Sequence, residues 1–239
     1  GGGPGAAPWA AADTWPTITA TTVLDRAEPA LDLGRELAAS SPVLARRVRW
    51  CRQAVGNGLR LPEADLVTVS YLLGEVAEDD RRAVVEEAAA RGQVVAVVEP
   101  GTPAGYARTR AARDVLVAAG MSVGAPCPHN GTCPITPGED WCHFAVRLPR
   151  STVHRRLKGG SLGYEDEKFC YVVAAREPVA PAGGRVLRHP VRRKGLVELE
   201  ICAPGGAVVR ETVTKKRHPE LYRKARDTAW GAAWPPGDR

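Results

Sequence analysis

Two mostly apolar runs, separated by one helix-length segment, constrain the fold of this 239-residue chain more than any other feature. The runs are ADLVTVSYLL at 64–73 and QVVAVV at 93–98. The segment 79–91 between them has the apolar spacing of a helix and is followed by Gly92. Strands that are apolar on both faces are typical of parallel sheets covered by helices. This pattern predicts an α/β domain with a parallel sheet.

The remaining elements follow from turn residues and local periodicity. We expect helices at 6–12, 29–39, 41–55, 104–119 and 218–229, strands at 18–25 and 168–175, and a small β-meander at 185–214. The strand at 168–175 is expected near the sheet edge. No run of about 18 apolar residues is present, so no membrane span is expected. The chain does not begin with Met, which favours a fragment or a processed form.

Charge is divided unevenly along the chain. Residues 1–150 hold 15 Arg and no Lys against 17 acidic residues, a net charge of −2. Residues 151–239 hold 12 Arg and 6 Lys against 10 acidic residues, a net charge of +8, and the two sum to +6. This asymmetry favours a cofactor-binding or catalytic front part followed by a surface for a polyanion, the alternative being a solvated basic face.

A glycine run opens the chain as Gly1, Gly3 and Gly5, and Asp25 ends the next predicted strand 20 residues after Gly5. Glycines let a backbone approach a nucleotide cofactor closely, and an acid at this spacing accepts hydrogen bonds from ribose hydroxyls. The strand expected before the glycines is missing. The spacing favours a nucleotide-cofactor site, with a plain glycine-rich terminus as the alternative.

The stretch CPHNGTCPITPGEDWCHF at 127–144 holds three cysteines and two histidines among turn-forming residues. Its composition excludes a regular helix or strand and favours metal ligation by Cys127, Cys133 and Cys142. The candidates for a fourth ligand are His129, His143, Cys170 and Cys202. We favour Cys202, because it lies where a strand meets a turn, whereas Cys170 has the setting of a core thiol. Four thiolates suit either Zn²⁺ or an iron–sulfur cluster, and the wide spacing favours the cluster slightly.

Several stretches together carry a resemblance to a known family. They are GGGPGAAPWAA, ADLVTVSYLLGE, VVEPGTPAGYARTRAARD, APCPHNGTCP, DWCHFAVRLPRS and HRRLKGGSLGYEDEKF. The chain resembles the ribosomal small-subunit methyltransferase-like family over nearly its whole length. Mitochondrial members of that family assist assembly of the small ribosomal subunit, and bacterial members are usually labelled rRNA methyltransferases. The Ala- and Arg-rich composition favours a bacterial, cytoplasmic member that lacks its N-terminal part.

The resemblance implies a class I methyltransferase (Rossmann-like) sheet, a Cys-ligated metal loop and a small C-terminal β-meander. It implies an S-adenosylmethionine-binding domain at 1–125 that lacks its first strand. Residues 126–178 then form the cysteine loop, basic run and edge strand, and residues 179–239 form a basic meander and terminal helix. Gly1, Gly3, Gly5 and Asp25 match the family's cofactor loop. A four-iron, four-sulfur cluster would be held by Cys127, Cys133, Cys142 and Cys202, with zinc as the alternative.

The sequence contains no motif that identifies how a methyl group would be transferred. The polar–Pro–Pro–aromatic motif of amine methylation is absent, because its place reads Ser-Tyr-Leu-Leu at 70–73. Tyr71 and Glu99 are the candidates for lining the cofactor pocket, and no catalytic residue is assigned. The chain is therefore either a methyltransferase acting on small-subunit rRNA or a non-catalytic rRNA-binding assembly or translation factor. A redox or iron sensor that gates ribosome assembly is a weaker third possibility.

Basic residues on two segments are the candidate contacts to small-subunit rRNA or an assembly intermediate, in a chain expected to be monomeric. The candidates are Arg147, Arg150, Arg155, Arg156, Lys158, Arg192, Arg193 and Lys194.

Overall fold

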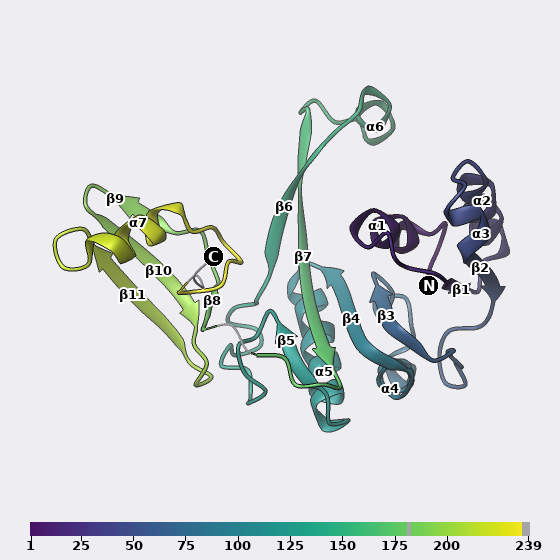
Figure 1. Ribbon diagram of the computed structural model, residues 1–239, viewed down its shortest axis with the longest axis horizontal. Helices are drawn as coiled ribbons and strands as arrows, with labels where there is room; N and C mark the ends of the chain where they lie inside the picture. The colour runs from purple at the N-terminus through teal and green to yellow at the C-terminus, as the bar shows by residue number, and fades with distance from the viewer. Residues whose placement is uncertain (181–182, 236–239) are drawn as a thin grey trace. The chain divides into compact units, whose positions relative to one another are not determined.

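The computed structural model describes residues 1–180 and 183–235 (Figure 1). Its helices are α1 (Ala6–Thr14), α2 (Glu28–Ala39), α3 (Leu44–Arg47), α4 (Glu78–Arg91), α5 (Pro103–Ala118), α6 (Thr152–Lys158) and α7 (Pro219–Asp227). Its strands are β1 (Thr21–Asp25), β2 (Val48–Arg52), β3 (Ala64–Ser70), β4 (Gly92–Pro100), β5 (Ser122–Ala125), β6 (Phe144–Pro149), β7 (Tyr164–Ala175), β8 (Arg185–Val186), β9 (Val191–Arg193), β10 (Leu196–Cys202) and β11 (Val208–Thr214).

In the part of the chain that the structure describes, the strands form three sheets. β1 and β2 are parallel neighbours. A larger sheet has the order β3-β4-β7-β5, with β6 also paired to β7. A C-terminal sheet has the order β11-β10-β8, with β9 also paired to β10. Helices separate most of the first five strands, although β3 follows β2 with no helix between them, so the α/β class is confirmed. The meander at 185–214 is likewise confirmed as an antiparallel sheet.

The chain divides into two compact units, one of residues Gly1–Val97 and one that begins at Val98. The boundary falls inside β4. In the first unit, Leu31 of α2, Val69 of β3 and Val84 of α4 are among the buried side chains. The three-part division expected from the sequence stays a prediction. No helix in the two described ranges is long and apolar enough to cross a membrane.

The helix predicted at 41–55 is wrong. Helix α3 covers only Leu44–Arg47, and the chain then extends into β2, whose residues Val48–Arg52 pair in parallel with β1. Val, Trp and Cys in this segment favour an extended backbone, and pairing with β1 satisfies the strand's hydrogen-bonding groups. The Ser-Pro signal at 41–42 therefore starts one helical turn and no more.

The strand predicted at 168–175 exists, but its placement near the sheet edge is wrong. β7 begins earlier, at Tyr164, and lies between β4 and β5 in the sheet order. Its first half pairs with β6, from Phe144↔Phe169 to Pro149↔Tyr164, as the long hairpin that carries α6 (Figure 1). Its second half, from Cys170 onward, is largely buried. The apolar alternation therefore reflects an interior strand.

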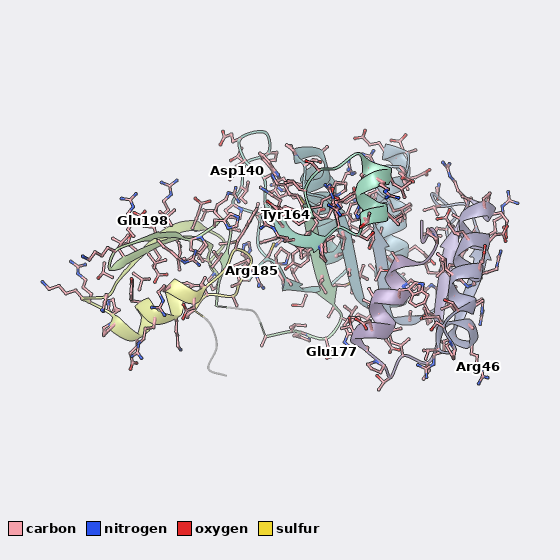
Figure 2. All side chains as sticks on the ribbon, turned by 90° about the horizontal axis from the view of Figure 1, so that it is seen from above. Arg46, Asp140, Tyr164, Glu177, Arg185 and Glu198 are labelled. Atoms are coloured by element: carbon pink, nitrogen blue, oxygen red, sulfur yellow. The ribbon has the colours of Figure 1, made fainter. Side chains whose placement is uncertain are left out.

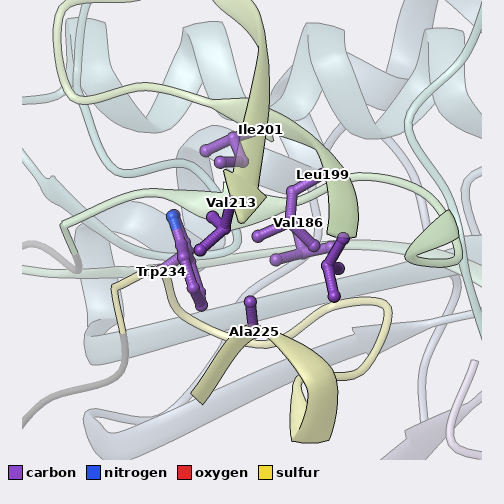
Figure 3. Close-up of a cluster of buried hydrophobic side chains, with 7 residues drawn as sticks. Val186, Leu199, Ile201, Val213, Ala225 and Trp234 are labelled. Atoms are coloured by element: carbon purple, nitrogen blue, oxygen red, sulfur yellow. The ribbon is translucent and has the colours of Figure 1, made fainter. Parts of the chain in front are cut away.

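A hydrophobic cluster joins the C-terminal sheet to α7 and to the end of the described chain (Figure 3). Its members are Val186, Val197, Leu199, Ile201, Val213, Ala225 and Trp234. Trp234 is also fixed by a 2.7 Å hydrogen bond from its Nε1 to the Glu211 carboxylate. Because this cluster draws on β8, β10, β11 and α7, the meander has its own core.

Candidate cysteine-lined cavity and cofactor loop

A cavity of about 40 Å³ lies in the second unit and is lined by five cysteines. Four of them are the predicted ligands Cys127, Cys133, Cys142 and Cys202, and the fifth is Cys170. Residues separated by up to 75 positions therefore meet in one enclosed space. The cavity is larger than one water molecule requires. Cys170 donates a hydrogen bond from its thiol to the Cys142 carbonyl at 3.1 Å, which agrees with its interpretation as a structural thiol.

Helix α5 forms one wall of the cavity and is positioned by a tight turn. The Thr102 hydroxyl caps it by accepting a hydrogen bond from the Gly105 N–H at 3.1 Å. A Cβ atom at Gly105 would lie 1.9 Å from the Pro100 carbonyl oxygen, so only glycine fits there. On the helix, the Tyr106 hydroxyl lies 3.2 Å from Cys133 Sγ, and either atom can donate.

Arginine side chains tie the cysteine loop to its surroundings. Arg113 of α5 donates from Nη2 to the carbonyls of His129 and Gly131, at 2.9 and 2.6 Å. Arg185 of β8 donates from Nε to the Pro126 carbonyl at 2.9 Å. Arg188 binds both oxygens of Asp140, and Asp140 and Arg185 are labelled in Figure 2. The loop is thus fastened to α5 on one side and to the segment around β8 on the other.

Burial raises the pKa of the thiols around the cavity. The pKa of Cys202 rises to about 12, chiefly through burial and also through the neighbouring Cys127 and Cys133. The pKa of Cys142 lies well above its usual value for the same two reasons, burial and nearby thiols. Burial also raises the pKa of Cys127, although the Arg113 guanidinium opposes that rise. Thiolates here need a strong positive partner in order to form.

The thiols are not gathered tightly around one point. Within residues 1–180 and 183–235, no three His, Cys, Asp or Glu side chains are arranged to hold a single metal ion. Ligands of one tetrahedral zinc each lie about 2.3 Å from the ion. The four predicted ligands line one cavity, whereas a metal-bound loop stays a prediction.

The two histidines of the stretch lie beside the cavity in different settings. His129 Nε2 is 3.6 Å from Cys202 Sγ, within hydrogen-bonding range for sulfur, and its Nδ1 is buried without a partner. His143 stacks on Trp141 at 5.0 Å between ring centroids and meets Trp230 edge-on. Burial lowers the pKa of both rings. His129 is therefore placed to contact Cys202, while His143 belongs to an aromatic cluster.

Sequence reasoning missed Tyr106, Arg113 and Arg185 as cavity residues. Tyr106 and Arg113 are seven residues apart, as are residues on one face of a helix. The available sequence signal for a polar cavity wall was that an Ala-rich helix places a Tyr, a Thr and an Arg on its inner face. Arg185 carried no signal of its own, because it follows a Pro- and Gly-rich segment far along the chain.

The predicted glycine loop and Asp25 do lie together in the first unit. One oxygen of Asp25 accepts the Gly3 N–H at 2.8 Å, and the other accepts the Ala27 N–H at 2.8 Å. Burial raises the pKa of Asp25, but backbone hydrogen bonds from Ala27, Gly3 and Arg26, together with the N-terminal ammonium, outweigh it, so that the pKa lies below its usual value. The carboxylate stays ionised and still has lone pairs for further donors.

The three glycines of the loop have different roles. A Cβ atom at Gly1 would lie 2.4 Å from the Leu72 side chain, and one at Gly5 would lie 2.6 Å from the Trp50 ring. A larger residue at Gly1 would displace the Leu72 side chain, and one at Gly5 would displace the Trp50 ring and would also have to adopt a φ of +91. Gly3 has φ +52 with nothing within 4 Å of its Cβ position, so its backbone faces open space. Of the three, Gly3 is the one whose surroundings leave room for a ligand.

Tyr71 and Glu99, the other predicted pocket residues, differ in exposure. Tyr71 is 42% exposed and directly follows β3. It has a positive φ of 53, which is strained for a bulky side chain and is uncommon away from functional sites. Glu99 is fully buried, and its carboxylate accepts a hydrogen bond from Arg108 Nε at 2.6 Å. The structure gives Glu99 an ion-pairing role, and its cofactor role stays a prediction.

On the β6–β7 hairpin, the predicted RNA contacts are partly engaged within the chain. Arg147 forms two hydrogen bonds to Asp166, at 2.7 and 2.8 Å, and lies 4.0 Å from the centroid of the Tyr164 ring. Arg150 pairs with Glu165 at 2.9 Å. Arg155 has a buried Nε without a partner, whereas Arg156 and Lys158 are exposed in the last turn of α6. Arg156 and Lys158 are thus the more available cations.

The basic residues of the C-terminal sheet also divide into those bound within the chain and those left exposed. Arg192 donates to the carbonyls of Arg226 and Thr228, at 2.8 and 2.6 Å, and so holds the end of α7. Arg193 lies 3.8 Å from Glu198, a residue labelled in Figure 2. Lys194 is exposed, beside the tight turn at Gly195. The backbone N–H of Lys215 donates to the Gly195 carbonyl at 2.9 Å, which joins the two basic runs at one end of the sheet.

Comparison with known proteins finds a matching family and several relatives. The family described as mitochondrial small ribosomal subunit Rsm22 matches residues 1–235. Ribosome assembly protein RSM22 of Saccharomyces cerevisiae, a mitochondrial protein, is 36% identical over an alignment of 179 residues that covers 48% of this chain and 28% of that protein. The mitochondrial Rsm22-cox11 tandem protein 1 of Schizosaccharomyces pombe is 24% identical over an alignment of 185 residues that covers 60% of this chain and 25% of that protein. The chain spans about a quarter of the length of these relatives.

Solved structures show more distant likenesses. The YcgJ protein of Bacillus subtilis has a TM-score of 0.45 at 13% identity, covering 75% of this chain and 90% of that chain. A putative methyltransferase of Thermoplasma acidophilum has a TM-score of 0.42 at 14% identity, covering 66% and 57%. These likenesses are too distant to carry an inference.

The expectation of a bacterial cytoplasmic protein is contradicted by these relatives. The matched yeast proteins are mitochondrial, and so is the family by its description. Ala- and Arg-rich composition was the basis of that expectation. Composition reflects coding bias as well as cellular location, so it was a poor guide to where the protein works.

Proposed function

The chain belongs to the Rsm22 family, and on that premise we propose that it acts in assembly of the small ribosomal subunit by binding rRNA. The mitochondrial relatives provide the setting for this role. One structural observation carries the RNA-binding part: two basic runs, distant in sequence, meet at one end of the C-terminal sheet. Its exposed cations are Lys194, Lys215, Lys216 and Arg217, which together we call the sheet-end patch.

The chemistry of the sheet-end patch suits a phosphate backbone. Flexible lysines contact phosphates as point charges, without demanding a base sequence. Within the described ranges these four side chains form no ion pair, so their charges are available to a bound phosphate backbone. Arg156 and Lys158 on α6 are proposed as a second contact. Folded rRNA is an extended polyanion and can engage both surfaces.

A triple substitution tests the patch. Lys194→Gln, Lys215→Gln and Lys216→Gln together should weaken binding to a small-subunit rRNA fragment at least tenfold, roughly the effect of three lost phosphate contacts. Fluorescence anisotropy at fixed salt gives the affinity. The matched control is Arg210→Gln on β11, an exposed cation of the same sheet that faces Glu200 at 3.7 Å. Equal affinity of the triple variant and the control would count against the proposal.

We further propose that the four cysteines hold a metal group, with a four-iron, four-sulfur cluster favoured over zinc. The donor set fits such a group, since four thiols line one buried cavity and Cys170 is hydrogen-bonded elsewhere. A cluster bridges thiolates that stand farther apart than the ligands of one ion. When bound, it would supply an electron-accepting, cross-linking centre. The chain's own residues provide the thiols, shield them from water and fasten the loop to β10.

Metal analysis of anaerobically purified protein tests this part. Cys202→Ser should lose most of the iron or zinc and any visible absorption, whereas Cys170→Ala should retain both. Wild-type protein without stoichiometric metal would rule the group out. If Cys170→Ala lost metal as fully as Cys202→Ser, the proposed ligand set would be wrong.

A second candidate function is S-adenosylmethionine-dependent methyl transfer to rRNA. It is favoured by the Asp25–Gly3 arrangement, by the open space beside Gly3 and by strained, exposed Tyr71 next to Leu72, on which Gly1 packs. Calorimetric titration with S-adenosylmethionine decides whether the cofactor binds. Mass-spectrometric mapping of small-subunit rRNA, with and without the gene, then separates catalysis from binding alone.

A further inference from the structure

Three arginines, Arg110, Arg113 and Arg185, are among the residues that line the cysteine cavity, and no carboxylate lines it among the described residues. Their hydrogen bonds near the cavity go to backbone carbonyls of the cysteine loop, which are neutral acceptors. Arg110 donates to the Ile135 carbonyl at 3.2 Å, and the other two donate to carbonyls between Pro126 and Gly131.

Arg113 is the most deeply placed of the three. It is 4% exposed, and its Nε is buried without a hydrogen-bond partner. One carboxylate lies near it, that of Asp114 at 3.2 Å from Nη1, but the Asp114 side chain is 61% exposed. A solvated carboxylate offsets little of the charge of a buried guanidinium. A buried cation of this kind is costly unless an anion accompanies it.

The four thiols are the groups able to become that anion. Each predicted ligand lines the same cavity as the guanidinium groups, and a thiolate is the form that binds metal. Four thiolates carry more negative charge than a Zn²⁺ ion or an oxidised four-iron cluster carries positive charge. The bound group as a whole is therefore an anion, and its negative charge is complementary to the positive charge of the three arginines.

We infer that Arg110, Arg113 and Arg185 form the counter-charge of a thiolate-bound metal group, and that Arg113 is its main positioning residue. This inference rests on the proposed metal site. Arg113 acts in two ways: its Nη2 shapes the loop between Cys127 and Cys133 through two carbonyls, and its charge favours the anionic, metal-bound state. A nearby positive charge also favours the reduced form of a redox group, because reduction adds negative charge.

A pair of substitutions separates charge from shape. Arg113→Lys keeps the charge but loses the planar fork, and Arg113→Gln loses the charge but keeps one donor. Arg113→Gln should weaken metal retention against a competing chelator by about 10–100-fold, with Arg113→Lys between it and the wild type. If the group is an iron–sulfur cluster, spectroelectrochemistry should show a more negative reduction potential for Arg113→Gln. Arg210→Gln, outside the cavity, should match the wild type.

The outcomes separate this inference from the metal proposal. Wild-type protein that purifies without metal overturns both, before any arginine is changed. If the wild type is metal-loaded, and Arg113→Gln and Arg113→Lys both match its metal retention and its reduction potential, the arginine role alone is overturned. If Arg113→Gln fails to fold, as circular dichroism would show, Arg185→Gln replaces it, because Arg185 comes from β8 and contacts the loop at Pro126. Unchanged retention and potential in Arg185→Gln would then overturn the inference.

Discussion

The Nε of Arg108 donates to the Glu99 carboxylate across 2.6 Å, where β4 turns into α5. Glu99 is fully buried, while the Arg108 side chain is 18% exposed. A buried carboxylate of this kind is stable only with a compensating partner. The pair therefore helps to fix the start of α5, the helix that carries Tyr106 and Arg113 into the cysteine cavity.

Breaking that pair should destabilise the protein strongly. Arg108→Met removes the guanidinium partner of a buried charge and should cost about 3–5 kcal/mol in the free energy of unfolding. The control is Arg82→Met on α4, whose partner Glu86 lies at 2.7 Å on the surface and which should cost less than about 1 kcal/mol. Urea unfolding measures both variants. Similar losses in the two would show that Glu99 does not depend on Arg108.

The Asp25 contacts predict a pH dependence of stability. Because the folded-state pKa of Asp25 lies below its ordinary value of 3.8, the stabilisation is present above that value and is lost as the pH falls through the folded pKa. Asp25→Asn should lower the free energy of unfolding by about 1 kcal/mol at pH 7, and the difference from wild type should shrink below pH 4. A difference that is constant from pH 7 to pH 3 would contradict this assignment.

The C-terminal core predicts a large effect from one truncation. Leu199 of β10 is 2% exposed within the cluster of Figure 3, so Leu199→Ala should cost about 2–5 kcal/mol. Val209 of the neighbouring β11 is 41% exposed, and Val209→Ala should change stability by about 0.5 kcal/mol or less. Thermal unfolding compares the two. A Leu199→Ala variant as stable as Val209→Ala would argue against a separate core for this sheet.

The hairpin arginines should differ in their importance for RNA. Arg156→Gln removes an exposed cation that forms no ion pair within the described residues, and it should weaken rRNA affinity several-fold, with a smaller salt dependence. Arg147→Gln removes a cation already bound to Asp166 and Tyr164, so its affinity should stay within about twofold of wild type. Anisotropy titrations at two salt concentrations test both. Equal losses would mean that the Asp166 pair opens on binding.

Local patterns were sufficient for most of the secondary structure. The apolar runs at 64–73 and 93–98 correspond to β3 and β4, and the Gly and Pro positions mark the ends of α4 and α5. The segment 41–55 failed because its helix-start signal is local, whereas the pairing of β2 with β1 is a contact between distant residues. The same limit explains β7, whose interior position depends on which strands flank it.

The sequence by itself determined most of the strands and helices. It also predicted a cofactor site at the glycine loop and Asp25, and it predicted metal ligation by Cys127, Cys133, Cys142 and Cys202. Each depends on residue type and short-range spacing, which a chain displays before it folds. Only the tertiary structure decided that Cys202 meets Cys127 in one cavity and that Arg113 lies buried beside them. It also decided that Arg147 and Arg192 form hydrogen bonds within the chain, while Lys194 and Lys215 share one exposed end of a sheet. Burial and pairing are properties of packed neighbours, and those neighbours come from distant parts of the chain.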